Sequence, residues 1–305
     1  MVAKGAQFMS ETAMSETVPP LGLMLDLDGP ISSPEERRIA IPSIRSNLVL
    51  LAGAGVPIAF ITGRSDTFVR EEIIEPLHAD GLSPDARMFA VCEKGAVWAP
   101  ITADGMGDLT VDREVALPKD FADDIRGIVQ RDFADTMFFD ETKRAMITLE
   151  QNRDVSSERY REAQQRMNEA AFDALVRHGL GARLGDRETP DAEGRVPFRV
   201  DPTIISTDIE SVTLNKDIGA ERALDYFSQH GALPRLWRTV GDSRSDYLMA
   251  DHLHASGFDV AHVDVRPSEG ILDRPYRIVT EGDAINDAAG AAFLEHWVDT
   301  LGLRP

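Results

Sequence analysis

The chain has 305 residues and a hydrophobic fraction of 43%, which suffices for about two domains with their own cores. Its formal net charge of −20 argues against a main role in binding nucleic acid or anionic membranes. The single cysteine, Cys92, excludes an intramolecular disulfide and a cysteine-based zinc cluster, and no apolar run approaches the roughly 20 residues of a membrane-spanning helix.

The first part of the chain alternates between short apolar runs and helical patterns. Short apolar runs predict buried strands, and apolar residues three or four positions apart predict helices. The expected elements are a strand at 21–25, a helix at 35–54, a strand at 56–61, a helix at 66–78 and a strand at 88–92. This alternation indicates a parallel sheet with right-handed crossovers.

The pattern changes near residue 99 and returns near residue 213. The intervening segment has expected strands at 109–117, 144–150, 195–206 and 211–214 and helices at 120–133 and 156–178. The first pattern then resumes with a helix at 217–230, a strand at 236–240, a helix at 247–255, strands at 258–263 and 276–279, and a helix at 284–301.

We therefore predict an α/β fold with two domains and a tail. The core domain, residues 20–98 and 213–305, is a doubly wound, Rossmann-like parallel sheet, and residues 99–212 form a smaller inserted α+β domain. Residues 1–19 lack the apolar centre of a secretory signal and are expected to form a mobile tail, so we expect a cytoplasmic protein.

Two carboxylates follow the first expected strand. Asp26 and Asp28 alternate with Leu27, so both point to the same side at the carboxyl edge of the sheet, where ligands bind in such folds. This pair suits a divalent cation such as Mg²⁺, or a division of labour between a nucleophile and a general acid/base. In a chain with 52 acidic residues, however, such a pair also arises by chance or forms only a turn.

Three further points could converge with these acids. Thr62 ends the second strand and could hold a phosphoryl oxygen, or only cap a helix. Asp242 and Asp246 follow the strand at 236–240 and could bind a cation or form an ordinary strand-to-helix turn. Lys216 begins a helix and could supply positive charge beside the acids, or be a solvated surface lysine.

Taken in order, these segments resemble a known family. The motifs DLDGPI, ITGRS, Lys216 in NKDIG, and GDSRSD resemble the four motifs of the haloacid dehalogenase superfamily of phosphohydrolases. The insert between the second and third motifs resembles the α+β cap of the subgroup that includes sugar-phosphate phosphatases and phosphomannomutases. This resemblance implies that residues 99–212 form a cap domain that sets substrate specificity. Glu93-Lys94-Gly95-Ala96 resembles the Glu-Asn-Gly-Ala turn of that subgroup.

The resemblance implies a role for each motif residue. Asp26 is the expected nucleophile and forms an aspartyl-phosphate, while Asp28 is the expected general acid/base. Thr62 and Lys216 hold the transferring phosphoryl group, as further catalytic residues. The expected Mg²⁺ ligands are Asp26, the backbone carbonyl of Asp28, and Asp242, with Asp246 supporting the metal or Lys216. The expected substrate-binding residues are Thr62, Gly63, Arg64, Lys94 and Lys216.

Some positions depart from the family pattern or leave alternatives open. Pro30 stands where threonine is usual, which removes a backbone N–H, and Ser245 stands where asparagine is frequent. Lys94 could grip an acidic substrate group, whereas Arg64 could equally pack across a helix start. Residues that could face the substrate from the cap are Arg144, Glu150, Arg153, Arg195 and Arg199, most of which we expect to be solvated.

The expected function is thus a Mg²⁺-dependent phosphatase, a phosphoric monoester hydrolase. The expected partner is a small phosphorylated metabolite, through the resemblance a sugar phosphate, with no nucleic acid and no membrane, and the protein is expected to be a monomer or small homo-oligomer. Two alternatives remain open, a phosphomutase on the same scaffold and a non-catalytic sugar-phosphate-binding protein. Cys92 is expected to be a packed core thiol.

Overall fold

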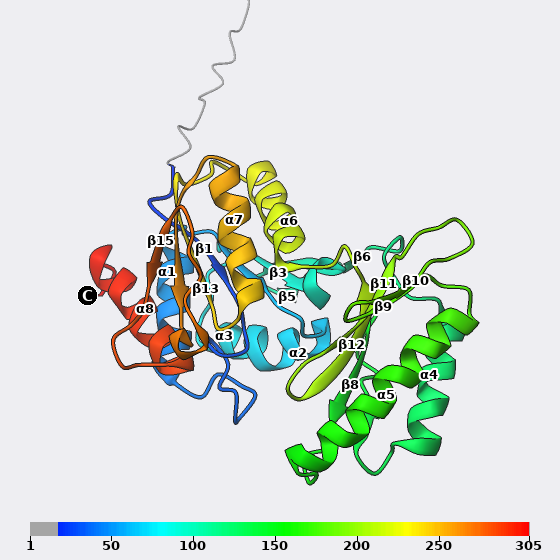
Figure 1. The fold of residues 1–305 in the computed structure, drawn as a ribbon. Helices are drawn as coiled ribbons and strands as arrows, with labels where there is room; N and C mark the ends of the chain where they lie inside the picture. The colour runs from blue at the N-terminus through cyan, green and yellow to red at the C-terminus, as the bar shows by residue number, and fades with distance from the viewer. Residues whose placement is uncertain (1–17, 305) are drawn as a thin grey trace, which may run out of the picture.

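The computed structural model describes residues 18–304, which contain two β-sheets lying side by side (Figure 1). The mobile tail expected at residues 1–19 lies outside this range except for its last two residues. Within residues 18–304, no helix combines the length and apolar character needed to cross a membrane.

The larger sheet is parallel in its centre, with the strand order β15-β14-β13-β1-β2-β3, and continues at one edge with the antiparallel strands β4, β5 and β6. The strands are β1 (Gly22–Leu25), β2 (Ile58–Ile61), β3 (Met88–Cys92), β4 (Val97–Thr102), β5 (Gly105–Met106), β6 (Thr110–Val111), β13 (Leu236–Gly241), β14 (Asp259–Asp264) and β15 (Arg277–Val279). The strands β2 and β3 follow on one side of β1, and β13, β14 and β15 follow on the other. Ligands are expected at the carboxyl end of the strand where the strand order reverses in this way.

Helices cover both faces of this sheet. The helical segments are α1 (Pro42–Gly53), α2 (Asp66–Val69), the π-helical turn η1 (Arg70–Ile74), α3 (Glu75–Ala79), α6 (Lys216–Gln229), α7 (Tyr247–Ala255) and α8 (Asn286–Thr300). Leu23 and Leu25 of β1 pack with α1 and α8 on one face, whereas Met24 packs with α6 and α7 on the other. This period-two burial on both sides confirms the doubly wound α/β core.

The second sheet is the cap, inserted between β6 and α6. Its strand order is β10-β9-β11-β12-β8-β7, and its elements are α4 (Lys119–Asp132), β7 (Met137–Phe139), β8 (Ile147–Gln151), α5 (Ser157–Arg177), β9 (Ala182–Leu184), β10 (Arg187–Thr189), β11 (Phe198–Pro202) and β12 (Ser206–Ser211). The helices α4 and α5 pack on one face of this sheet, away from the core (Figure 1). Ile147 and Leu149 of β8 point to these helices, so Thr148 and Glu150 point to the opposite, polar face.

Several expected elements differ in their limits. The first helix begins at Pro42 rather than at residue 35, because proline suits the first helical position and disfavours helix in the residue before it. The strand expected at 109–117 shortens to β6, and the strand expected at 211–214 lies at Ser206–Ser211 instead. The cap boundary expected at residue 99 falls inside β4, which belongs to the larger sheet.

Candidate active site

The polar strand ends of the core meet at one edge of the larger sheet. Asp26 follows β1, Thr62 follows β2 and Asp242 follows β13, and the parallel register sets Leu25 beside both Phe60 and Val240. The backbone N–H of Asp26 donates to the carbonyl of Val240, which continues the pairing to the strand end. The elements of the parallel sheet therefore bring these motif residues together.

Lys216 lies between two buried carboxylates. Its Nζ is 2.7 Å from Oδ1 of Asp26 and also hydrogen-bonds Oδ1 of Asp246. Asp26, Lys216 and Asp246 are 5%, 6% and 0% exposed, so these charges are screened little by water. Lys216 is thus a buried counter-ion at the first position of α6 and not a solvated surface residue.

The charges of this cluster shift one another's pKa values. Burial lowers the pKa of Lys216, but the charges of Asp246 and Asp26 outweigh it and raise that pKa above its usual range. Burial, opposed by Lys216 and reinforced by Asp246, raises the pKa of Asp26 well above its usual range. Burial and the charge of Asp246 raise the pKa of Asp242 to about 6. The carboxylates are therefore crowded, and a bound cation would relieve this crowding.

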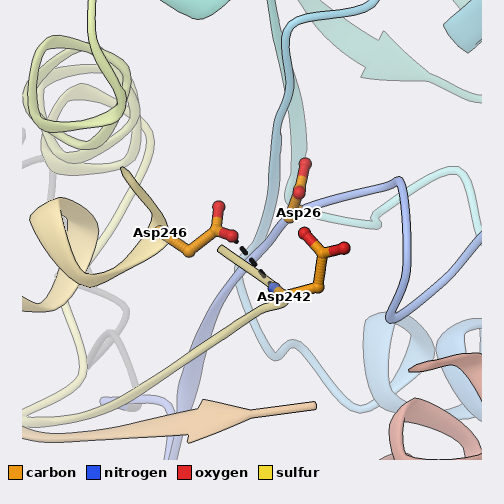
Figure 2. A group of neighbouring side chains, drawn as sticks. All are labelled: Asp26, Asp242 and Asp246. Atoms are coloured by element: carbon orange, nitrogen blue, oxygen red, sulfur yellow. Dashed lines mark hydrogen bonds between the residues drawn. The ribbon is translucent and has the colours of Figure 1, made fainter. Parts of the chain in front are cut away.

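Three carboxylates could hold such a cation. Asp26, Asp242 and Asp246 each offer one oxygen, and these oxygens lie within 4.8 Å of one another (Figure 2). Carboxylate oxygens are the ligands that Mg²⁺ prefers, so the donor set fits this ion. Oδ2 of Asp246 already accepts hydrogen bonds from the backbone N–H groups of Asp242 and Ser243, at 2.9 and 2.8 Å, so Asp246 also orients the turn that carries Asp242.

Thr62 is fully buried at the end of β2. Its Oγ1 accepts a hydrogen bond from the backbone N–H of Arg64 at 3.0 Å, whereas the side chain that caps α2 is that of Ser65. Thr62 is therefore not the helix cap that the sequence left open as an alternative. The carbonyl of Gly63 accepts a hydrogen bond from Nζ of Lys143, which ties this loop to the segment leading into β8.

Asp28 has a different partner from Asp26. Nε and Nη2 of Arg64 each donate to one oxygen of Asp28, both at 2.9 Å, and Nη1 of Arg64 donates to Oε1 of Glu150 in the cap at 3.2 Å. The carboxylate of Asp28 therefore lies outside the group of three possible cation ligands and is held by a two-pronged arginine contact instead.

Lys94 joins the core to the cap. Its Nζ lies 2.9 Å from Asp208 and 2.9 Å from Glu210 on β12, and 3.5 Å from Asp201 on β11. Arg199 also holds Glu210, with its Nη2 at 2.7 Å. Burial lowers the pKa of Lys94, but Asp208 and Glu210 outweigh it and raise that pKa. Lys94 thus stays charged at the boundary between the two domains.

The five cap residues singled out from the sequence have different surroundings. Glu150 and Arg199 take part in the ion pairs just described. Arg144 binds a carboxylate of the core, and Arg195 pairs with acids of its own loop. Arg153 is exposed. Only part of this group therefore lies near the motif residues.

The two departures from the family pattern are accommodated locally. The turn around Pro30 is held by backbone N–H groups of residues 29, 31 and 32, so its hydrogen bonds do not need a donor at position 30. Oγ of Ser245 lies 2.9 Å from Oγ of Ser243, within the turn after β13.

Sequence reasoning missed three residues next to the site. Nη1 of Arg37 lies 2.9 Å from Oε2 of Glu150, and Nη1 of Arg266 lies 2.7 Å from Oδ2 of Asp242. Asp208 is the third, and no alternation of polar and apolar residues marks it, because Ile209 is the one apolar residue of β12. Arg37 and Arg266 lie in loops, where no hydrophobic periodicity predicts the direction of a side chain.

The sequence matches no established family profile and no curated protein. Solved structures do match. The C-terminal domain of trehalose-6-phosphate phosphatase from C. albicans has a TM-score of 0.57 and 14% identity, covering 94% of this chain and 94% of that one. A haloacid dehalogenase-like hydrolase from Bacteroides thetaiotaomicron has a TM-score of 0.56 and 10% identity, covering 90% and 98%. Trehalose-6-phosphate phosphatase from Aspergillus fumigatus has a TM-score of 0.51 and 16% identity, covering 92% and 93%. The chain therefore has the fold of the haloacid dehalogenase-like hydrolases, with their cap, as its four motifs predicted.

Proposed function

We propose that this protein is a Mg²⁺-dependent phosphatase that hydrolyses a small phosphate monoester through an aspartyl-phosphate. The observation that carries the proposal is the arrangement around Asp26: a buried carboxylate 2.7 Å from Lys216, with Asp242 and Asp246 close enough to share a cation. Asp28, two residues further on, supplies a second carboxyl group for proton transfer.

The reaction takes two steps. In the first, a carboxylate oxygen of Asp26 attacks phosphorus, the bond from phosphorus to the leaving oxygen breaks, and the proton of the Asp28 carboxyl group moves to that oxygen. In the second, water attacks the phosphorus of the aspartyl-phosphate, its proton passes to Asp28, and the bond to Asp26 breaks. Inorganic phosphate leaves, and both side chains return to their starting states.

The need to balance negative charge explains the proposed roles of the residues around Asp26. An anionic nucleophile must approach an anionic phosphate, and Lys216 offsets this repulsion at Asp26. Asp26 and Asp242, with Asp246 behind them, would hold Mg²⁺. When bound, Mg²⁺ neutralises charge on the transferring phosphoryl group. Thr62, at the end of the neighbouring strand, is proposed to hold one of its oxygens.

The proposed substrate is a sugar phosphate. Support comes from the fold neighbours named as trehalose-6-phosphate phosphatases, and from the polar face that the cap sheet turns toward the core. Buried, unpaired Cys92 is in keeping with a reducing compartment, so we place the reaction in the cytoplasm.

Phosphate release tests the proposal. The panel contains glucose 6-phosphate, trehalose 6-phosphate, glycerol 3-phosphate and p-nitrophenyl phosphate, each with Mg²⁺ and with a chelator, for the wild type and Asp26→Asn. Asp104→Asn, an exposed position in the turn between β4 and β5, is the matched control. We expect metal-dependent release that is lost in Asp26→Asn and kept in Asp104→Asn. Release that survives in Asp26→Asn, or a folded wild type that releases phosphate from none of the compounds, overturns the proposal.

A further inference from the structure

A chain of ion pairs runs from the proposed acid/base into the cap and back to the core. Arg64 holds Asp28 through two hydrogen bonds of 2.9 Å, and its third donor reaches Glu150 at 3.2 Å. The other oxygen of Glu150 accepts from Arg37 at 2.9 Å. One cap carboxylate thus contacts two arginines of the core.

The guanidinium of Arg64 is held on three sides. Asp28 binds one edge, Glu150 binds another, and the ring of Phe68 lies against its face, with the ring centroid 4.8 Å from the guanidinium carbon. A planar guanidinium with a fixed fork of donors transmits orientation between its partners, which a flexible ammonium would not. The angle at which Asp28 is presented therefore depends on where Glu150 holds Arg64.

The second arginine on Glu150 lies in an unusual backbone conformation. Arg37 has φ 55°, in the left-handed region, which costs a residue with a side chain on the order of 1 kcal/mol. The turn is kept by hydrogen bonds between Ser33 and Arg38 and between Arg37 and Ser33. Since Arg37 lies in the connection from β1 to α1, the same connection that carries Asp28 also fixes Glu150.

The burial of these ion-paired side chains fits a role in orienting Asp28. The side chains of Glu150 and Arg64 are 10% and 16% exposed, whereas that of Asp28 is 38% exposed. The carboxyl group that must meet the substrate thus remains accessible, and the groups behind it are shielded from water, where their charge-assisted hydrogen bonds are stronger. Arg37 lines a cavity of about 440 Å³ between the core and the cap.

We propose that Glu150 of the cap is a positioning residue, which holds Arg64 and through it orients Asp28 toward the leaving oxygen. Proton delivery to the leaving group then requires the cap to be docked on the core. This inference rests on the proposed function, because it concerns the step in which Asp28 protonates the leaving group. This positioning role differs from a purely structural contact between the domains, whose loss would lower the rates for all substrates alike.

The choice of leaving group distinguishes a positioning role of Glu150 from a purely structural contact between the domains. p-Nitrophenolate leaves with little help from a proton, whereas an alkoxide needs one, and general acid catalysis is typically worth about 10²- to 10⁴-fold. First-turnover rates are therefore compared for p-nitrophenyl phosphate and for the alkyl phosphate that the wild type hydrolyses fastest in the panel above. The first turnover isolates formation of the aspartyl-phosphate from the second step, in which Asp28 also acts.

Glu150→Gln keeps the size of the side chain and removes its charge. We expect about a 10-fold or greater fall in the first-turnover rate with the alkyl phosphate, and a change within about twofold with p-nitrophenyl phosphate. The matched control is Glu141→Gln, which breaks an exposed cap ion pair with Arg126 and should change neither rate. Equal losses on both substrates, or no loss on the alkyl phosphate, overturn the proposal.

A double-mutant cycle provides the second readout. If Glu150 acts through Asp28, Asp28→Asn combined with Glu150→Gln should be no slower on the alkyl phosphate than Asp28→Asn alone. Losses that multiply would show that Glu150 acts independently and contradict the inference. An inactive wild type would instead refute the proposed phosphatase, so the two failures are distinguishable.

Discussion

Gly29 lies against Asp242 so closely that a Cβ atom at residue 29 would be 2.8 Å from the Cβ of Asp242. Its φ of +96° is also one that residues with side chains rarely adopt. The turn that carries Asp28 and the strand end that carries Asp242 can therefore approach each other only with glycine at this position. This contact links the first motif to the fourth.

Gly29→Ala should displace Asp242 and weaken Mg²⁺ binding. We expect about a 10-fold or larger loss of affinity, of the size that displaced supporting groups cause around metal ligands. Isothermal titration with Mg²⁺ measures it. Gly105→Ala is the matched control, because Gly105 has a similar φ of +115° but a Cβ atom there would meet nothing within 4 Å. Equal losses in both variants would mean that backbone strain, not the contact with Asp242, is responsible.

Lys216→Met should lower both activity and stability. The substitution leaves Asp26 and Asp246 buried beside each other without their counter-ion, and breaking a buried pair in this way costs about 3–5 kcal/mol. Urea unfolding in the presence of a chelator measures the loss, and added Mg²⁺ should restore part of it. Lys119→Met, at the first position of α4 on the surface, should change the free energy of unfolding by less than about 0.5 kcal/mol. Unchanged stability in Lys216→Met would contradict the buried-pair interpretation.

The core could be predicted from the sequence because its signals are local. The ends of parallel strands meet at one edge, so placing Asp26, Thr62 and Asp242 at strand ends already places them near one another. The helix predicted at 35–54 begins only at Pro42, a residue that suits the first helical position, and the apolar residues at helical spacing, Ile44, Leu48 and Leu51, all follow it.

The contacts between cap and core could not be predicted in this way. Whether Glu150 meets Arg37 and Arg64 depends on how the two sheets dock, and no periodicity in either segment carries that information. The turn after β3 is similar, because Glu93 and Lys94 both have positive φ without being glycine, so local preferences argue against the conformation they adopt.

Stabilisation by Mg²⁺ should depend on pH. Burial and the charge of Asp246 raise the pKa of Asp242 to about 6, so the folded protein binds a proton there more readily than the unfolded chain. Ionisation of Asp242 between about pH 4 and 6 therefore lowers the free energy of unfolding when no cation is bound. Protons compete with Mg²⁺ for this carboxylate.

The difference in melting temperature between samples with Mg²⁺ and with chelator should thus be larger at pH 7 than at pH 5. Differential scanning fluorimetry measures it at both values. Asp242→Asn cannot titrate at this position and should lose most of the difference. A wild-type difference that does not change with pH would rule out Asp242 as a ligand whose ionisation is coupled to Mg²⁺ binding.

Glu93→Gln should loosen the connection between the cap and the core. The fully buried carboxylate of Glu93 accepts hydrogen bonds from the backbone N–H groups of Arg144, Ala145 and Met146, at 2.8, 2.9 and 3.0 Å. A glutamine amide has one accepting oxygen, so at least one of these buried N–H groups loses its partner, which costs about 1–3 kcal/mol. Hydrogen exchange at residues 144–146 should become faster, while exchange in β1 should change only as far as global stability does. If exchange at residues 144–146 stays as slow as in the wild type, Glu93 does not hold the connection between the cap and the core.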